Sequence, residues 1–118
     1  MAAGDLAAAG EHYRAGLAIV RRLTEAHLDV FLPELARSLT SLGIVMTELG
    51  RHDEAQALDH EALTIYLRLH RRHPDRFADD VENAKRNLMI DLVHSGRTND
   101  EAARELEQLI RASHAHSD

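Results

Sequence analysis

Apolar residues recur every three or four positions along most of the chain, which is the spacing of one face of an α-helix. The pattern is clearest in the segment 33–49, where the apolar positions are Leu35, Leu39, Leu42, Met46 and Leu49. No segment alternates with the period of two that is typical of a strand, and the sequence contains no Asn-Gly or Asp-Gly hairpin turn. The pattern therefore predicts an all-α fold.

Glycine and proline divide this pattern into five predicted helices. Gly50 and Gly96 are expected to end helices, because glycine readily adopts the backbone conformation that follows a helix C-terminus. Pro33 is expected in the first turn of its helix, where a missing N–H costs nothing, and Pro74 is expected to end the helix before it. The predicted helices cover residues 5–27, 33–49, 53–72, 79 to the glycine at 96, and from there to 113.

The chain also resembles itself at an offset of 46 residues. At this offset identical residues meet in many places, among them Gly50 with Gly96, Phe31 with Phe77, Leu42 with Leu88, and Ile44 with Ile90. Helical segments that recur at a fixed period of this size are typical of stacked helix pairs. We therefore expect a repeat of about 46 residues in which each helix pair packs on the next.

The composition narrows the class of protein. The 118 residues suffice for one domain, and the absence of cysteine excludes disulfides and thiolate metal sites. A formal charge of −6 disfavours binding to nucleic acid. No uninterrupted apolar run reaches the roughly 18 residues that span a bilayer, and the first residues lack the basic region of a secretory signal. We expect a cytoplasmic domain that binds neither nucleic acid nor a membrane. Its many Arg and Ala residues are typical of high-GC bacteria.

The middle of the chain carries small and apolar residues in a distinctive order: Leu39, Leu42-Gly43, Met46, Leu49-Gly50-Arg51, Glu54-Ala55, Ala62-Leu63 and Ile65-Tyr66. This order resembles a tetratricopeptide repeat, in the long form found in kinesin light chains and in many actinobacterial proteins. The resemblance implies an α-solenoid of antiparallel helix pairs, in which Gly43 and Ala62 let neighbouring helices approach closely. Residues 1–118 would then form one domain, with the second helix of a partial repeat at 5–27, a full repeat at 33–72 and a degenerate or capping repeat at 79–113.

The resemblance also implies where a ligand would bind. In this family the first helix of each repeat lines a concave groove that holds a ligand peptide. Here Arg37 and Arg86 favour an acidic ligand segment, and Ile44 and Ile90 are expected to make apolar contacts. Long-form repeats often carry an Asn pair at positions that in this chain read Thr40-Ser41 and Arg86-Asn87. The residues expected to face the groove are Arg37, Thr40, Ser41, Ile44, Thr47, Asn83, Arg86, Asn87, Ile90 and Val93.

No motif in the sequence points to catalysis or to a cofactor. The chain has no Gly-x-Ser-x-Gly, no Gly-rich nucleotide loop and no His-Glu-x-x-His. The four arginines between 68 and 76 form the one basic cluster, and the acids around position 80 favour local ion pairing over nucleic-acid binding. We therefore expect that the protein is not an enzyme and needs no cofactor.

The nine histidines raise the question of a metal site. His70 and His73 share a helix face, but two arginines lie between them and would oppose a metal. His60 and His94 lie near acids and are interpreted as surface residues. A zinc site needs three or four converging ligands, and no local spacing supplies them. We therefore expect no metal site.

These observations predict a non-catalytic module that binds a partner protein or peptide in its concave groove. The alternative is a self-assembly or regulatory part of a larger signalling or NTPase-linked tetratricopeptide repeat protein. The helix at 5–27 would be the second helix of a pair without its first, which leaves an apolar stripe uncovered. We therefore also expect association of two copies through exposed helix ends.

Overall fold

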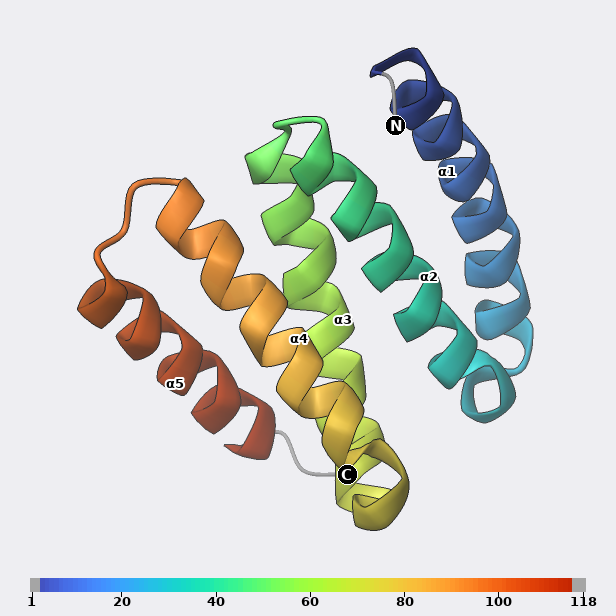
Figure 1. Cartoon of the computed structure of the whole chain (residues 1–118). Coiled ribbons are helices and arrows are strands. Elements are labelled where there is room, and N and C mark those ends of the chain that lie inside the picture. Colours follow the sequence, from blue (N-terminus) through green and yellow to red (C-terminus); the bar gives the residue numbers. More distant parts are fainter. Residues whose placement is uncertain (1–2, 116–118) are drawn as a thin grey trace.

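The computed structural model describes residues 3–115, which form five helices (Figure 1). No strand occurs in this part of the chain, so the predicted all-α class is confirmed. The helices are α1 (Ala3–Ala26), α2 (Leu28–Glu48), α3 (His52–Arg72), α4 (Pro74–His94) and α5 (Asn99–Ala115).

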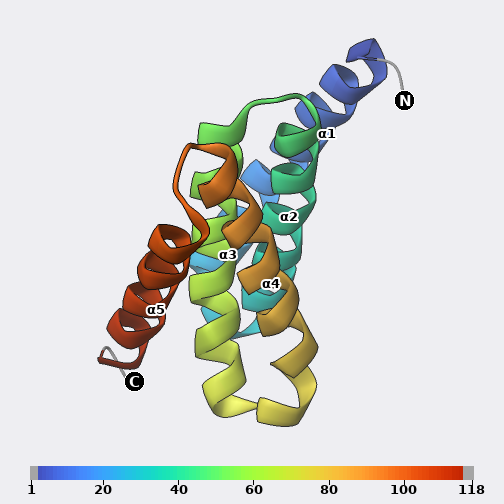
Figure 2. The same cartoon turned by 60° about the vertical axis from the view of Figure 1, so that its left-hand side comes forward.

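The helices form an open, two-layered array. Each of the first four helices packs along the next, and α5 contacts both α3 and α4 (Figure 2). The described residues extend over 42 × 39 × 21 Å, so the array is about two helix diameters thick. The two terminal helices, α1 and α5, lie at opposite edges of the array, as Figure 1 shows. The arrangement is therefore not a closed bundle.

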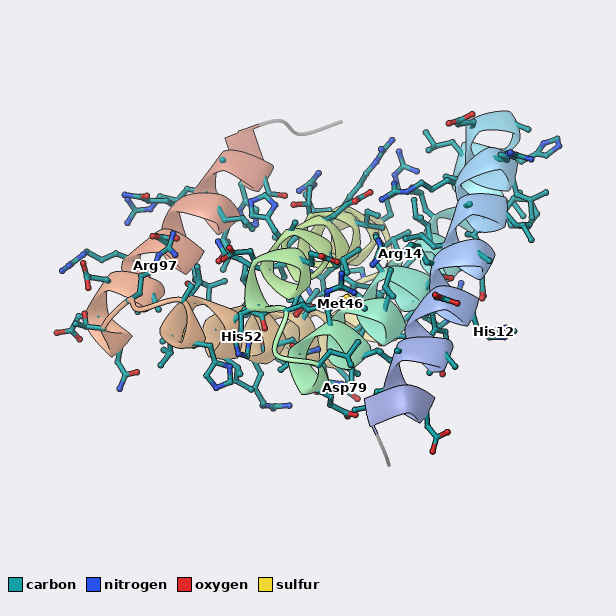
Figure 3. The ribbon with its side chains drawn as sticks, turned by 90° about the horizontal axis from the view of Figure 1, so that it is seen from above. His12, Arg14, Met46, His52, Asp79 and Arg97 are labelled. Carbon is teal, nitrogen blue, oxygen red and sulfur yellow. The ribbon has the colours of Figure 1, made fainter. Side chains whose placement is uncertain are left out.

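Polar contacts show which helices share a layer. Arg14 reaches from α1 to Glu54 at the start of α3, with 3.1 Å between Nη2 and Oε2, and passes over Met46 of α2 (Figure 3). About two helical turns further along α1, Arg21 makes two hydrogen bonds of 2.7 and 2.8 Å to Glu61. These pairs join α1 to α3 across α2. The helices α2 and α4 also approach each other, because Thr47 of α2 lies 3.3 Å from Asp91 of α4.

The core consists of the apolar stripes predicted from the sequence. On α2, α3 and α4 nearly every predicted stripe residue is buried, including Leu39, Leu42, Met46, Ala55, Ala62, Leu63, Leu88 and Leu92. The stripes of the outer helices are covered less well. On α1 the side chains of Tyr13 and Leu23 are exposed, and on α5 Ala103 is exposed while Leu106, Leu109 and Ile110 are half-buried.

Two predicted helix starts were wrong. The helix α2 begins at Leu28 and α4 at Pro74, each five residues before the predicted start. In both cases a histidine takes the N-cap position in the same non-helical backbone conformation, with φ −141° and ψ 70° at His27 and φ −138° and ψ 71° at His73. Pro74 therefore occupies the first turn, where no N–H is needed. Pro33 instead lies inside α2, where it removes one hydrogen bond of the helix.

The predicted helix stops are confirmed. Gly50 and Gly96 have φ values of +78° and +102°, in the region that favours glycine. The N–H of Arg51 donates to the Met46 carbonyl at 2.8 Å, and the N–H of Arg97 donates to the Leu92 carbonyl. Each of these two hydrogen bonds joins the first and the sixth residue of its turn, as in a Schellman motif, so the two helices end in the same way.

The start of α5 defines how the last repeat aligns with the repeat before it. Thr98 and Glu101 cap it reciprocally: the Thr98 N–H donates to Glu101 at 2.9 Å, and the Glu101 N–H donates to the Thr98 hydroxyl at 3.1 Å. As a result α5 begins one residue later than an offset of 46 would place it. Ala102 then takes the place of Ala55, and both side chains are completely buried.

The segment Val30–Glu48 in α2 is the one described helix that is long and apolar enough, by length and composition, to cross a membrane. The same composition is found in core helices of folded domains. In this structure the apolar residues of α2 pack between α1 and α3, and Leu32, Leu35, Ala36, Leu39, Leu42, Val45 and Met46 are buried. Helix packing therefore accounts for these buried residues, whereas Val30 and Ile44 of the same segment remain exposed.

The turn after α2 provides a test of the helix stop. We expect Gly50→Ala to lower the free energy of unfolding by about 1–2 kcal/mol, because an L-residue is strained at this positive φ. Gly16→Ala, inside α1 where a Cβ would meet no atom within 4 Å, should instead raise it by up to about 1 kcal/mol. Urea denaturation of both variants measures the two effects, and equal effects would contradict this account of the turn.

Candidate functional site

The residues predicted to line a groove all reach the surface of α2 or α4. Ile44 and Ile90, which occupy equivalent positions of the two repeats, are 47% and 43% exposed. Val93, Arg37, Asn83 and Arg86 are also exposed, and the other predicted residues, Thr40, Ser41, Thr47 and Asn87, are half-buried. Ile44 and Ile90 thus place large, partly exposed apolar side chains at equivalent positions of the two helices.

A pocket of about 170 Å³ lies between these two helices, and we call it the central pocket. It brings together four predicted residues from both repeats, namely Ile44, Thr47, Asn87 and Ile90. It also contains three residues that were not predicted to belong to a binding surface, namely Glu48, Asp59 and Asp91. The central pocket is therefore formed by α2, α3 and α4 together.

A second, shallower hollow of about 440 Å³ lies between α1 and α2. On its α2 side it is lined by Arg37 and Ser41, which were predicted to face the groove. Arg37, Ser41, Ile44 and Glu48 follow one another at spacings of three and four residues, so they lie on one face of α2. The hollow and the central pocket thus border the same face of α2.

The polar side chains of this surface make short-range contacts. Arg37 pairs with Glu34 one turn earlier at 2.8 Å, and Arg86 donates to the Asn83 side chain at 2.9 Å. The Thr40 hydroxyl donates to the Ala36 carbonyl, and the single hydrogen of the Thr47 hydroxyl lies between two acceptors, the Gly43 carbonyl at 3.1 Å and Oδ1 of Asp91 at 3.3 Å. An exposed ion pair contributes at most about 1 kcal/mol, so Arg37 can exchange Glu34 for another carboxylate. Binding of an acidic ligand segment by Arg37 and Arg86 therefore stays a prediction.

Two aspartates form the floor of the central pocket. Asp59 and Asp91 are only 4% and 1% exposed, and Oδ1 of Asp91 accepts a hydrogen bond of 3.3 Å from Thr47. Burial, and then the hydrogen bond and the repulsion from Asp91, raise the pKa of Asp59 to about 9. Asp59 therefore carries a proton at neutral pH, and the two carboxyl groups share it.

Gly43 makes room for this pair of acids. A Cβ at Gly43 would lie 2.5 Å from Oδ1 of Asp59, closer than any side chain tolerates. The sequence suggested that this glycine lets two helix backbones approach. The structure shows that the space beside it is filled by the Asp59 carboxyl group.

The acid pair was not predicted from the sequence, although the sequence positions of the two acids contain a signal for it. Asp91 lies 46 residues after Val45, which is buried, and Asp59 lies one turn after the buried Ala55. Both acids therefore interrupt apolar stripes at positions that face the core. Their sequence neighbours His60 and His94 are exposed, as expected.

The arginine cluster lies at the end of α3 and the start of α4, and Arg68 and Arg71 line a hollow between α3 and α5. No three His, Asp or Glu side chains among the described residues converge as a metal would require. The His73 ring lies 6.3 Å from that of Phe77, and the Arg76 guanidinium lies 5.0 Å above the same ring. Arg71 donates to the backbone and hydroxyl of Ser113 and so holds the end of α5.

Comparison with known proteins gives one finding. Residues 35–75, which cover most of α2, all of α3 and the start of α4, match the family model described as tetratricopeptide repeat. No curated protein and no solved structure matches the chain. The family match supports a tetratricopeptide repeat protein, and repeats of this family generally mediate protein–protein interactions. It does not address the kinesin-light-chain-like or actinobacterial type.

The shared proton in the central pocket makes the stability depend on pH. Asp59 binds its proton more tightly in the folded than in the unfolded chain, so the free energy of unfolding falls as the pH rises from about 4 toward 9. The asparagine side chain in Asp59→Asn cannot ionise. We therefore expect this variant to lack the fall in the free energy of unfolding, which in the wild type amounts to at most about 1.4 kcal/mol for each pH unit. Thermal denaturation across this range measures the difference. Asp79→Asn, which alters an exposed acid on α4, is the control and should follow the wild type.

Proposed function

We propose that this chain is a non-catalytic interaction module, with residues 35–75 as its tetratricopeptide repeat, and that it holds a segment of a partner protein against the face formed by α2 and α4. The observation that supports this most directly is the exposure of Ile44 and Ile90 at equivalent positions of the two helices. Large apolar side chains that repeat on one exposed face lose contact with water when a partner covers them, which stabilises the complex.

The fold supplies this surface without further ordering. Both helices are fixed by a buried core, so their exposed faces hold their positions before a partner arrives. Binding to a rigid surface avoids the loss of conformational entropy that a flexible surface incurs. Arg37 and Arg86 lie on the same face and are available to carboxylates of the partner, while Thr40, Ser41, Thr47, Asn83, Asn87 and Val93 complete the surface.

We assign each of the five described helices to a repeat. The helix α1 is the second helix of a partial repeat, α2 and α3 form the full repeat, and α4 and α5 form a capping repeat. The helix α5 is less completely buried than α3 and α4, which is what we expect of a capping repeat. The long, kinesin-light-chain-like form and a cytoplasmic location belong to the same proposal.

A pair of double variants tests the surface. Ile44→Gln with Ile90→Gln removes the apolar contacts without adding charge and keeps good helix formers. It should reduce the amount of partner captured from a lysate of the source organism by about tenfold or more. The control, Ala57→Gln with Ala103→Gln, changes two exposed residues of α3 and α5 and should capture as the wild type does.

Equal capture by both double variants would contradict a binding surface on α2 and α4, provided that all proteins melt at similar temperatures. Arg37→Glu with Arg86→Glu separately tests the arginines. A loss of capture in this variant supports carboxylates on the partner, and unchanged capture would show that the arginines make no contact.

Self-association is the second candidate function, and a different surface favours it. Apolar side chains gather on α1 and at the start of α2, where Tyr13, Ile19, Leu23, Leu28 and Val30 are all exposed. The most exposed are Ile19 at 59% and Val30 at 71%. A second copy packed against α1 would cover them. This would fit a self-assembly or regulatory part of a larger signalling or NTPase-linked protein.

Light scattering tests self-association directly. We expect the wild type to form dimers at tens of micromolar, and Ile19→Glu with Leu23→Glu to remain monomeric, because a charge in an apolar interface loses its hydration. The control Ala57→Glu lies on α3 and should leave the dimer intact. A wild type that stays monomeric at this concentration would remove the self-association hypothesis.

A further inference from the structure

The acid pair on the floor of the central pocket has more acceptor oxygens than the fold supplies donors for. Asp91 is 1% exposed, and while its Oδ1 accepts from Thr47, its Oδ2 has no hydrogen-bond partner apart from the neighbouring Asp59 carboxyl group. A buried pair of carboxyl groups that shares one proton still costs free energy, because this one donor replaces only part of the water that the oxygens have lost. It lies in a pocket whose rim is open to solvent.

We propose that the central pocket receives an arginine side chain of the partner segment, whose guanidinium group bonds to Asp91 and Asp59 between Ile44 and Ile90. This inference rests on the proposed binding surface and names the chemistry of what binds there. The guanidinium supplies donors in addition to the one proton of Asp59 and the Thr47 hydroxyl. The two isoleucines contact the aliphatic stem of the arginine.

The charges around the central pocket favour a cation. Asp59 and Asp91 form the floor and Glu48 lines the wall, while no Lys or Arg side chain lines the pocket. The Asn87 amide and the Thr47 hydroxyl add oxygen acceptors. A carboxylate of a partner would meet like charges here, so the acids that Arg37 and Arg86 would bind must lie elsewhere along the segment.

The size and the ligands of the pocket favour a guanidinium over a metal ion. A volume of 170 Å³ corresponds to about six water molecules, which suits a group of several heavy atoms. Calcium takes roughly six to eight oxygen ligands, and no three acidic or histidine side chains among the described residues are placed to bind one ion. A guanidinium is flat, offers five donors and can bond two carboxyl oxygens at once.

Arginine also fits better than lysine for energetic reasons. The guanidinium is less strongly hydrated than an ammonium group, so it loses less on entering a pocket flanked by isoleucines. Its flat face can lie against the apolar side chains while its edge points at the floor. We therefore expect the affinity to follow the order arginine, lysine and then neutral analogues.

Nuclear magnetic resonance titration with three blocked tripeptides tests this order. The probes are Leu-Arg-Leu, Leu-Lys-Leu and Leu-citrulline-Leu, since citrulline keeps the shape of arginine and removes its charge. Leu-Arg-Leu should shift the methyl resonances of Ile44 and Ile90 and the amide resonances of Thr47 and Asn87. Citrulline should bind at least about tenfold more weakly, because the pairing with a buried charge is lost.

Two variants and a metal titration complete the test. Asp91→Asn should lower the affinity for Leu-Arg-Leu at least about tenfold, whereas Glu82→Gln, on the exposed side of the same helix, should leave it unchanged. Equal shifts with the arginine and citrulline peptides, or no shifts in the pocket at millimolar peptide, would overturn the proposal. Calcium chloride that produces the same shifts would also overturn it in favour of a metal site.

The outcome is separable from that of the proposed function. If the isoleucine double variant loses the partner while Asp91→Asn captures it normally, the binding surface stands and the arginine pocket is wrong. If neither variant affects capture but the arginine peptide binds in the pocket, the pocket stands and the partner binds elsewhere.

Discussion

The packing of α3 against two neighbours holds the whole structure together. This helix buries one side against α2 and the other against α4, and Leu63 and Ala62 between them are almost inaccessible to solvent. Small residues such as Ala55 and Ala62 keep the three helices close, and leucines fill the spaces beside them. Because α3 takes up the inner faces of α2 and α4, the outer faces of these two helices remain free to bind a partner.

The acid pair is a place where this packing includes groups that gain little from burial. A carboxyl group in the interior costs several kcal/mol unless it is neutralised or well paired, and a well-packed apolar pair would commonly be as stable or more so. Here Asp59 keeps a proton, Gly43 yields space, and the pair lies under an open pocket. We propose that binding of a partner, and not a gain in stability, accounts for this costly pair.

The edges of the array differ from its centre. The terminal helices α1 and α5 each cover only one side of their neighbours, and exposed or half-buried apolar residues remain on both. The ion pairs from Arg14 and Arg21 to α3, and the contact of Arg71 with Ser113, tie these edges to the centre. Such contacts orient the outer helices, while their apolar faces stay available to other chains.

The sequence by itself determined the helices, their stops at Gly50 and Gly96, the period of 46 residues and the exposed positions of Ile44 and Ile90, because each of these depends on local spacing. The sequence could not place the helix starts at Leu28 and Pro74. These starts are set by the backbone conformation of the N-cap residues His27 and His73, which lie before the apolar pattern begins. Only the tertiary structure brought Asp59 to Asp91. These residues lie on different helices, and periodicity within one helix carries no information about which side chain of another helix it will meet.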